Sequence, residues 1–114
     1  MGGIYYLYNI KGQNFVNEIL EEPVMSTGVI KSIVFKAKKG YYIEYDFNIN
    51  GGMLSSSTYR SDIGSIRNII VNKSFPVIYN KRHNDKNEIL FLPEDFKEFK
   101  MPYPDSLKWI TEHR

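Results

Sequence analysis

The carboxylates Glu44 and Asp46 stand two positions apart in a segment where polar and apolar residues alternate. Paired carboxylates act as acid and base in catalysis when their surroundings push their pKa values apart. Residues two positions apart also share one face of a strand, and on a solvent-facing strand they pair with neighbouring cations, here Lys31 or Lys36. We therefore interpret Glu44 and Asp46 as the polar face of a strand rather than as a catalytic pair.

The two histidines of the chain are distant from one another in the sequence. His83 and Asp85 would supply part of a catalytic pair, but the polar residues around them are typical of a hairpin tip. His113 is expected at a helix end, where a cation complements the dipole. The chain contains no Cys, which excludes thiolate nucleophiles, disulfides and cysteine-ligated zinc. The sequence thus predicts no catalytic site, no metal site and no cofactor.

Tyr42, Tyr59 and Arg60 form the set of residues whose types point to binding. Aromatic rings stack on bases and sugars, and Tyr and Arg are enriched at the centres of protein interfaces. If the segments that carry these residues pair as a hairpin, Tyr42 lies beside Tyr59, and we expect Arg60 at the strand end to reach solvent. The alternative is that a helix covers this face and makes the two tyrosines part of a second core.

Positions 41–60 predict that hairpin. Residues 41–49 alternate between bulky apolar and polar side chains, which is the pattern of a strand with one buried face. Asn50-Gly51-Gly52 follows and favours a tight two-residue turn, at Asn50-Gly51 or at Gly51-Gly52, after which the chain runs back. A two-residue turn places odd positions of the first strand opposite even positions of the second. The residues expected on the core face are Tyr41, Ile43, Tyr45, Phe47 and Ile49.

Shorter patterns predict the remaining elements. Apolar spacings of three and four indicate helices, and alternation indicates strands. Lys31 interrupts an alternating segment, which predicts either a strand that bends around a small barrel or a bulge near Lys31. Pro76 limits its strand to an edge or to the strand's start. In chain order we expect a helix at 13–22, a strand at 27–38, the hairpin, a helix at 62–72, strands at 75–79 and 88–92 around a loop at 80–87, a helix from Pro93 that buries Phe96 and Phe99, and a terminal helix from 105 or 106 that buries Leu107 and Ile110.

These elements predict an α+β fold with a small five-stranded antiparallel sheet, partly closed like a barrel, in the order α-β-β-β-α-β-β-α. Three strands, a helix and two strands is also the order of an oligonucleotide/oligosaccharide-binding (OB) barrel, an analogy at the level of the fold. The 114 residues suit one domain, with an N-terminal arm and helix at 1–24, a β-rich core at 25–92 and a helical tail at 93–114. The aromatic segment 1–10 is expected to form an edge strand or to dock on the core, and the remnant of a longer hydrophobic segment is the alternative.

Composition narrows the classes of partner. The formal net charge of +2 is too small to indicate nucleic acid by itself, for which a concentrated basic stripe is typical. No apolar run approaches the roughly 20 residues of a membrane helix, and the N-terminus lacks the basic region of a signal peptide. A hydrophobic content of 42% supports a real core.

Three pieces of the sequence together resemble a bacterial domain-of-unknown-function family of small β-rich modules, which are often attached to membrane or envelope proteins. The resemblance covers roughly residues 27–92. Its pieces are Gly28-Val29-Ile30, the Tyr-x-Phe-x-Ile-Asn-Gly run at 45–51, and Phe75-Pro76-Val77-Ile78-Tyr79-Asn80.

The chain departs from that family at Lys73-Ser74, where related sequences tend to have Gly, and at Arg82-His83-Asn84, where they tend to have Asn-Pro. The resemblance implies no catalytic residues, so none is assigned from it. Small bacterial β modules of this sort also recur as immunity proteins, which neutralise a toxin by binding it.

The sequence therefore predicts a non-enzymatic bacterial binding or accessory module that acts by protein–protein contact, of the immunity or envelope-associated type. The alternative is an OB-like barrel that binds single-stranded nucleic acid or an oligosaccharide through Tyr42, Tyr59 and Arg60. We expect a location in the cytoplasm or at the membrane periphery. The identity of the partner and the oligomeric state are left open.

Overall fold

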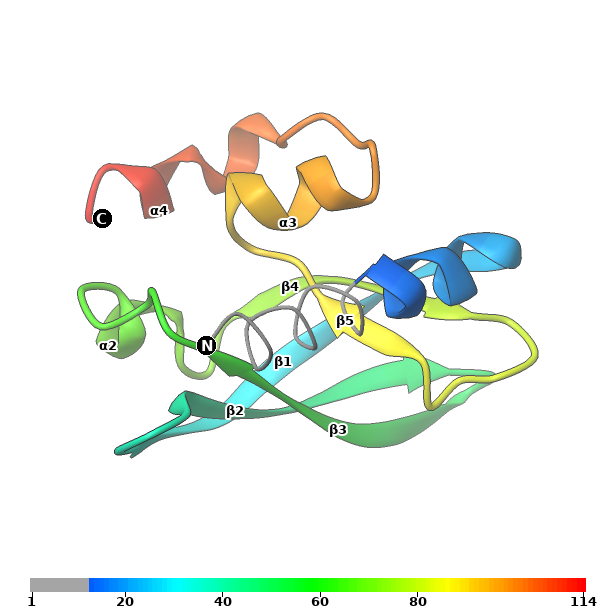
Figure 1. Cartoon of the computed structure of the whole chain (residues 1–114), viewed down its shortest axis with the longest axis horizontal. Coiled ribbons are helices and arrows are strands. Elements are labelled where there is room, and N and C mark those ends of the chain that lie inside the picture. Colours follow the sequence, from blue (N-terminus) through cyan, green and yellow to red (C-terminus); the bar gives the residue numbers. More distant parts are fainter. Residues whose placement is uncertain (1–12) are drawn as a thin grey trace, which may run out of the picture.

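The computed structural model describes residues 13–114 (Figure 1). A helix at 13–21 precedes a five-stranded sheet, and short helices follow the third and fifth strands. The strands are β1 (Pro23–Lys36), β2 (Gly40–Ile49), β3 (Gly52–Arg60), β4 (Ser74–Asn80) and β5 (Asn87–Ile89). The other helical elements are α2 (Arg67–Ile70), α3 (Pro93–Glu98), the 3-10 helix η1 (Asp105–Leu107) and α4 (Lys108–Thr111).

All neighbouring strands are antiparallel, and their order across the sheet is β3-β2-β1-β4-β5. The long strand β1 pairs with β4 through its first half and with β2 through its second half. The register shifts between Ile30 and Ser32, which confirms the bulge predicted at Lys31. The sheet therefore curls into a half-barrel, and the predicted α+β fold with a partly closed, barrel-like sheet is confirmed (Figure 1).

The core lies inside the curl and beneath the C-terminal helices, which Figure 1 shows above β4 and β5. Ile43, Tyr45 and Phe47 of β2 are fully buried, as their odd parity predicts. Phe96 and Phe99 also pack into the core from the α3 region. Full burial of one large apolar side chain contributes about 1.5–3 kcal/mol, so each of these residues contributes substantially to the stability of the fold.

The β2–β3 hairpin has the predicted register. Asn50 and Gly51 have φ angles of 48° and 81°, and positive values at both turn positions match a type I′ turn. Tyr45 then lies opposite Ser56, and Phe47 lies opposite Leu54, so small or medium residues face the large ones.

Three predicted elements differ in extent. The last strand, expected at 88–92, covers only Asn87–Ile89, because only these residues pair with β4. The helix expected at 62–72 is limited to Arg67–Ile70, since Gly64 and Ser65 disfavour helix and the preceding residues form turns. Its isoleucines still reach the core, with Ile63, Ile66 and Ile70 fully buried. The strand expected from residue 27 begins at Pro23, because β4 pairs with that first part of β1.

The prediction of an edge strand or docked patch at 1–10 lies outside the described residues. Within residues 13–114, no helix is long and apolar enough to cross a membrane.

Candidate functional site

The tyrosines Tyr42 and Tyr59 lie opposite one another on β2 and β3, with ring centroids 5.0 Å apart. Val34 of β1 lies opposite Tyr42, so the three side chains form a row across three strands. This row is on the outer face of the sheet, because the odd residues of β2 point into the core. Tyr59 is 43% exposed and Val34 is 46% exposed.

Two lysines from the end of β1 and the following turn approach these rings. The Lys36 Nζ lies 5.8 Å from the centroid of the Tyr42 ring, and the Lys39 Nζ lies 5.4 Å from that of Tyr59. A cation–π contact at an exposed site contributes about 0.5–1 kcal/mol and holds the cation over the face of the ring. We call the set Val34, Lys36, Lys39, Tyr42 and Tyr59 the tyrosine surface.

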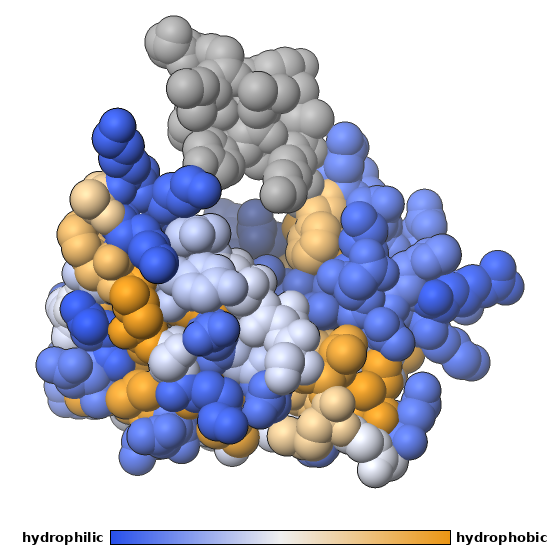
Figure 2. Space-filling view, turned by 90° about the horizontal axis from the view of Figure 1, so that it is seen from below, coloured by the Kyte–Doolittle hydropathy of each residue, from blue (hydrophilic) through white to orange (hydrophobic). Residues whose placement is uncertain are grey.

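None of the helices within residues 13–114 covers the tyrosine surface, as the exposure of Tyr59 and Val34 shows. The alternative in which these tyrosines form a second core beneath a helix is therefore wrong for this part of the chain. Figure 2 shows the molecule from the side on which β2 and β3 lie, where hydrophobic patches are set among hydrophilic side chains. Large apolar groups in such a setting are a feature of binding surfaces.

Glu44 and Asp46 lie on the same outer face, where Asp46 has the predicted lysine partner and Glu44 has a serine partner instead. The Ser32 hydroxyl donates to Glu44 at 2.9 Å, and the Lys31 ammonium pairs with Asp46 at 3.3 Å. The Ser55 hydroxyl also donates to Asp46 at 2.6 Å. This hydrogen bond, with Lys31, holds the pKa of Asp46 below its ordinary value. Both carboxylates lie beside the tyrosine surface on the outer face.

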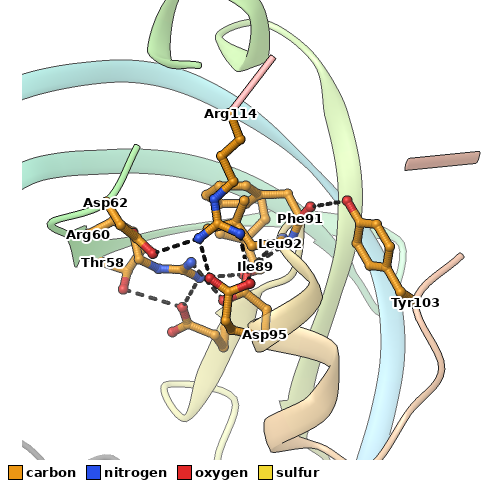
Figure 3. Close-up of polar contacts among 11 residues, drawn as sticks. Thr58, Arg60, Asp62, Ile89, Phe91, Leu92, Asp95, Tyr103 and Arg114 are labelled. Carbon is orange, nitrogen blue, oxygen red and sulfur yellow. Dashed lines mark hydrogen bonds and ion pairs between the residues drawn. The ribbon is translucent and has the colours of Figure 1, made fainter. Parts of the chain in front are cut away.

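Arg60 does not belong to the tyrosine surface, and the prediction that it reaches solvent beside the tyrosines is wrong. It lies opposite Tyr41, on the inner face, because neighbouring residues of a strand point to opposite sides. Its guanidinium donates to Asp95 at 2.8 Å, to Glu88 at 2.6 Å and to the Ile89 carbonyl at 2.9 Å (Figure 3). The Arg60 side chain is 11% exposed.

The Arg60 network is a second group of functional-type residues, and the sequence interpretation missed it. Burial alone would lower the pKa of Arg60, but the charges of Asp95 and Glu88 raise it overall. Burial raises the pKa of Glu88 despite the attraction of Arg60. Asp95 also accepts the backbone N–H groups of Phe91 and Leu92, at the start of α3.

A cavity of about 280 Å³ lies beside this network, next to the helix at 13–21. Arg114 pairs with Glu94 and Asp62 at the same place (Figure 3). No buried side-chain polar atom in the described part of the chain lacks a hydrogen-bond partner. The polar groups of the Arg60 network therefore all have partners within the protein. This favours a structural role, in which the network links β3 to β5 and α3, over a catalytic one. Its sequence signal is an Arg at a core-facing strand position, together with an acid three residues into a helix.

The remaining candidates have the predicted structural roles. His83 and Asp85 are exposed in the β4–β5 hairpin, where the Asn80 side-chain oxygen accepts the backbone N–H groups of Arg82 and His83. The His113 ring nitrogen lies 2.9 Å from the Trp109 carbonyl at the end of α4. No group of three acidic or histidine ligands that would hold a metal occurs within residues 13–114.

No family model, no curated protein and no solved structure matches this chain. The resemblance of residues 27–92 to a bacterial family of small β-rich modules thus stays a prediction. The tyrosine surface is the feature of the described residues that bears on function.

Proposed function

We propose that the protein is a non-enzymatic binding module that contacts another protein through the tyrosine surface. The observation that carries this proposal is the Tyr42–Tyr59 pair on the outer face, half-buried at Tyr42 and exposed at Tyr59, with a lysine at each ring. Such a cross-strand pair adds only about 0.2–1 kcal/mol to the stability of a sheet, whereas Tyr residues at the centre of an interface contribute strongly to affinity.

The charges around the pair define the partner. Lys36 and Lys39 favour a partner with carboxylates at the rim and an apolar group that packs on the tyrosine rings. Glu44 and Asp46 lie close by on the same face and would repel a phosphate backbone. The mixture of both charge signs therefore favours a protein partner over a nucleic acid.

Two finer roles are part of this proposal. An immunity-type protein needs a small, stable domain with one exposed surface that occludes a toxin, and an envelope accessory needs the same surface for docking. The support for a bacterial setting, in the cytoplasm or at the membrane periphery, is the family resemblance of residues 27–92.

A second candidate is an OB-like binder of single-stranded nucleic acid or an oligosaccharide. The observation in its favour is that two tyrosine rings on the outer face lie beside lysines on a curled sheet. Arg60 would not contact the ligand in this candidate function, because its guanidinium is paired with Asp95 and Glu88.

The test is an affinity capture from bacterial extract with the immobilised full chain, followed by calorimetry on the captured partner. The Tyr42→Ala/Tyr59→Ala variant is expected to weaken binding at least tenfold, which corresponds to about 1.4 kcal/mol. Met25→Ala is the matched control, because Met25 is also exposed, at 49%, but lies outside the tyrosine surface. Equal binding by all three proteins would contradict the proposal.

A panel of oligonucleotides and glycans separates the two candidates. Binding that depends on both tyrosines and falls steeply with salt would favour the nucleic-acid candidate. Glycan binding that depends on the tyrosines and is insensitive to salt would favour an oligosaccharide.

A further inference from the structure

Strand β3 forms one edge of the sheet, since β2 is its only neighbour in the strand order. The two-residue turn makes Ile49 and Gly52 exchange hydrogen bonds, and bonded pairs then alternate with non-bonded pairs along the hairpin. The non-bonded positions of β3 direct their N–H and C=O groups away from β2. These positions are Met53, Ser55, Ser57 and Tyr59.

Within residues 13–114, these four positions make no backbone hydrogen bond to a loop or turn. Natural edge strands usually carry Pro, Lys or a bulge that prevents further pairing. The β3 sequence Gly-Met-Leu-Ser-Ser-Ser-Thr-Tyr-Arg has no Pro and no Lys, and its register with β2 is unbroken from Gly52 to Arg60. The side chains of Thr58 and Arg60 reach β5 at the end of β3, but no strand among the described residues pairs with this edge, which is therefore open to strand addition within residues 13–114.

We propose that β3 pairs antiparallel with β3 of a second copy of this chain, with the two-fold axis at Ser56. Outward-directed positions must face outward-directed positions, so Ser55 lies opposite Ser57 of the second copy and Met53 lies opposite Tyr59. Each such pair exchanges two backbone hydrogen bonds. The two half-barrels then share one continuous sheet.

The side chains of β3 match this register. Met53 is 60% exposed and Tyr59 is 43% exposed, and the two-fold axis brings each against the other, a contact that sulfur and aromatic groups favour. The serines at the centre are small enough for close approach. None of the four positions is charged, so no like charges meet across the axis.

The nearest charged residue of β3, Arg60, is already held by Asp95 and Glu88. A second copy is the occupant that this symmetry selects, because an isologous contact requires a self-complementary surface. The dimer does not depend on the proposed binding function. It places the tyrosine surfaces of both copies on the same face of the shared sheet.

The test is the molar mass of the full chain, measured by sedimentation velocity over a range of concentrations. The expected species is a dimer of the 13.4 kDa chain. Ser55→Lys/Ser57→Lys is expected to be a monomer, because the introduced ammonium groups face each other across the axis. The variant should fold, because Asp46 and Glu44 lie opposite these positions within the chain. The uncharged control Ser55→Thr/Ser57→Thr is expected to stay dimeric.

Amide hydrogen exchange locates the interface. The N–H groups of Met53, Ser55, Ser57 and Tyr59 are expected to be protected in the wild type and unprotected in the lysine variant. A wild-type monomer, a lysine variant that stays dimeric, or a dimer with unprotected β3 amides would each overturn the proposal. A monomer with protected β3 amides would also overturn it, since another segment would then occupy the edge.

Failure of the dimer is distinguishable from failure of the binding function. The lysine variant leaves Tyr42 and Tyr59 in place, and Tyr42→Ala leaves the β3 edge in place. Tyr59 contributes to both surfaces, so the two proposals are separated by Tyr42→Ala, which changes only the tyrosine surface, and by the lysine variant, which changes only the β3 edge.

Discussion

Arg60 and Asp95 form an ion pair at 2.8 Å that joins the end of β3 to the first turn of α3. The same guanidinium reaches Glu88 of β5, and the Thr58 hydroxyl lies 3.4 Å from Glu88. The strands β3 and β5 are the two edges of the sheet and share no backbone pairing within residues 13–114. Side chains, rather than a fifth strand pairing, therefore hold the half-barrel closed.

Arg60→Met is expected to lower the free energy of unfolding by about 3–5 kcal/mol, because it leaves the Asp95 and Glu88 carboxylates without their cation. Urea denaturation measures this loss. The control is Arg82→Met, since the Arg82–Glu22 pair is exposed and should contribute about 0–1 kcal/mol. Equal losses for the two variants would show that the Arg60 network does not close the barrel.

Tyr45→Phe is expected to cost about 1–3 kcal/mol. The Tyr45 hydroxyl donates to the Asn87 side-chain oxygen at 2.5 Å, and both residues are buried, so the variant leaves a buried acceptor without a donor. Burial raises the pKa of Tyr45 far above its usual range, which keeps this donor protonated. Tyr79→Phe is the control, because Tyr79 is buried and no described hydrogen bond involves its hydroxyl. Thermal or urea denaturation of both variants decides the comparison.

Gly40→Ala is expected to destabilise the fold more than Gly51→Ala. Both glycines have positive φ, at 88° and 81°, so both substitutions carry the left-handed backbone penalty of about 1–2 kcal/mol. A Cβ at Gly40 would lie 2.7 Å from the Arg60 carbonyl oxygen, whereas a Cβ at Gly51 would meet nothing within 4 Å. Melting temperatures that fall equally would mean that the contact at Gly40 relaxes without cost.

Ser55→Ala is expected to raise the pKa of Asp46 towards its ordinary value of 3.8, because the Ser55 hydroxyl is the main group that lowers it. The lowered pKa means that ionised Asp46 stabilises the fold above about pH 3.8, and that this stabilisation is lost as the pH falls through the lower folded-state value. The variant should thus be less stable than wild type at pH 6, and the gap should close in acid. NMR titration of the Asp46 carboxyl gives the pKa, and Lys31→Gln, which removes a weaker contribution, is the comparison.

Tyr59→Ser is expected to change the free energy of unfolding by no more than about 1 kcal/mol, since the ring is partly exposed and loses mainly its contact with Tyr42. Phe47→Ala removes a fully buried ring and is expected to cost about 3–5 kcal/mol. A Tyr59 variant as unstable as the Phe47 variant would place Tyr59 in the core and remove it from the binding proposal.

Much of the hairpin follows from local rules. The alternation of residues 41–49 has a period of two, and the positive φ angles of Asn50 and Gly51 suit a two-residue turn, so parity alone places Tyr42 beside Tyr59. The same parity places Arg60 on the inner face. The prediction that Arg60 reaches solvent is wrong because a strand end is not open to solvent when other elements pack over it. The partners of Arg60 stand 28 and 35 residues further along the chain.

The sequence by itself determined which residues share a face, because backbone geometry repeats every two residues in a strand and every three to four in a helix. Only the tertiary structure decided what each face meets. The curl of β1, bent at Ile30/Ser32, brings β5 and α3 over the end of β3 and buries Arg60 between their carboxylates. Within residues 13–114, the same arrangement leaves Tyr42 and Tyr59 uncovered. Such long-range packing depends on how all elements fill the core together, which no local pattern encodes.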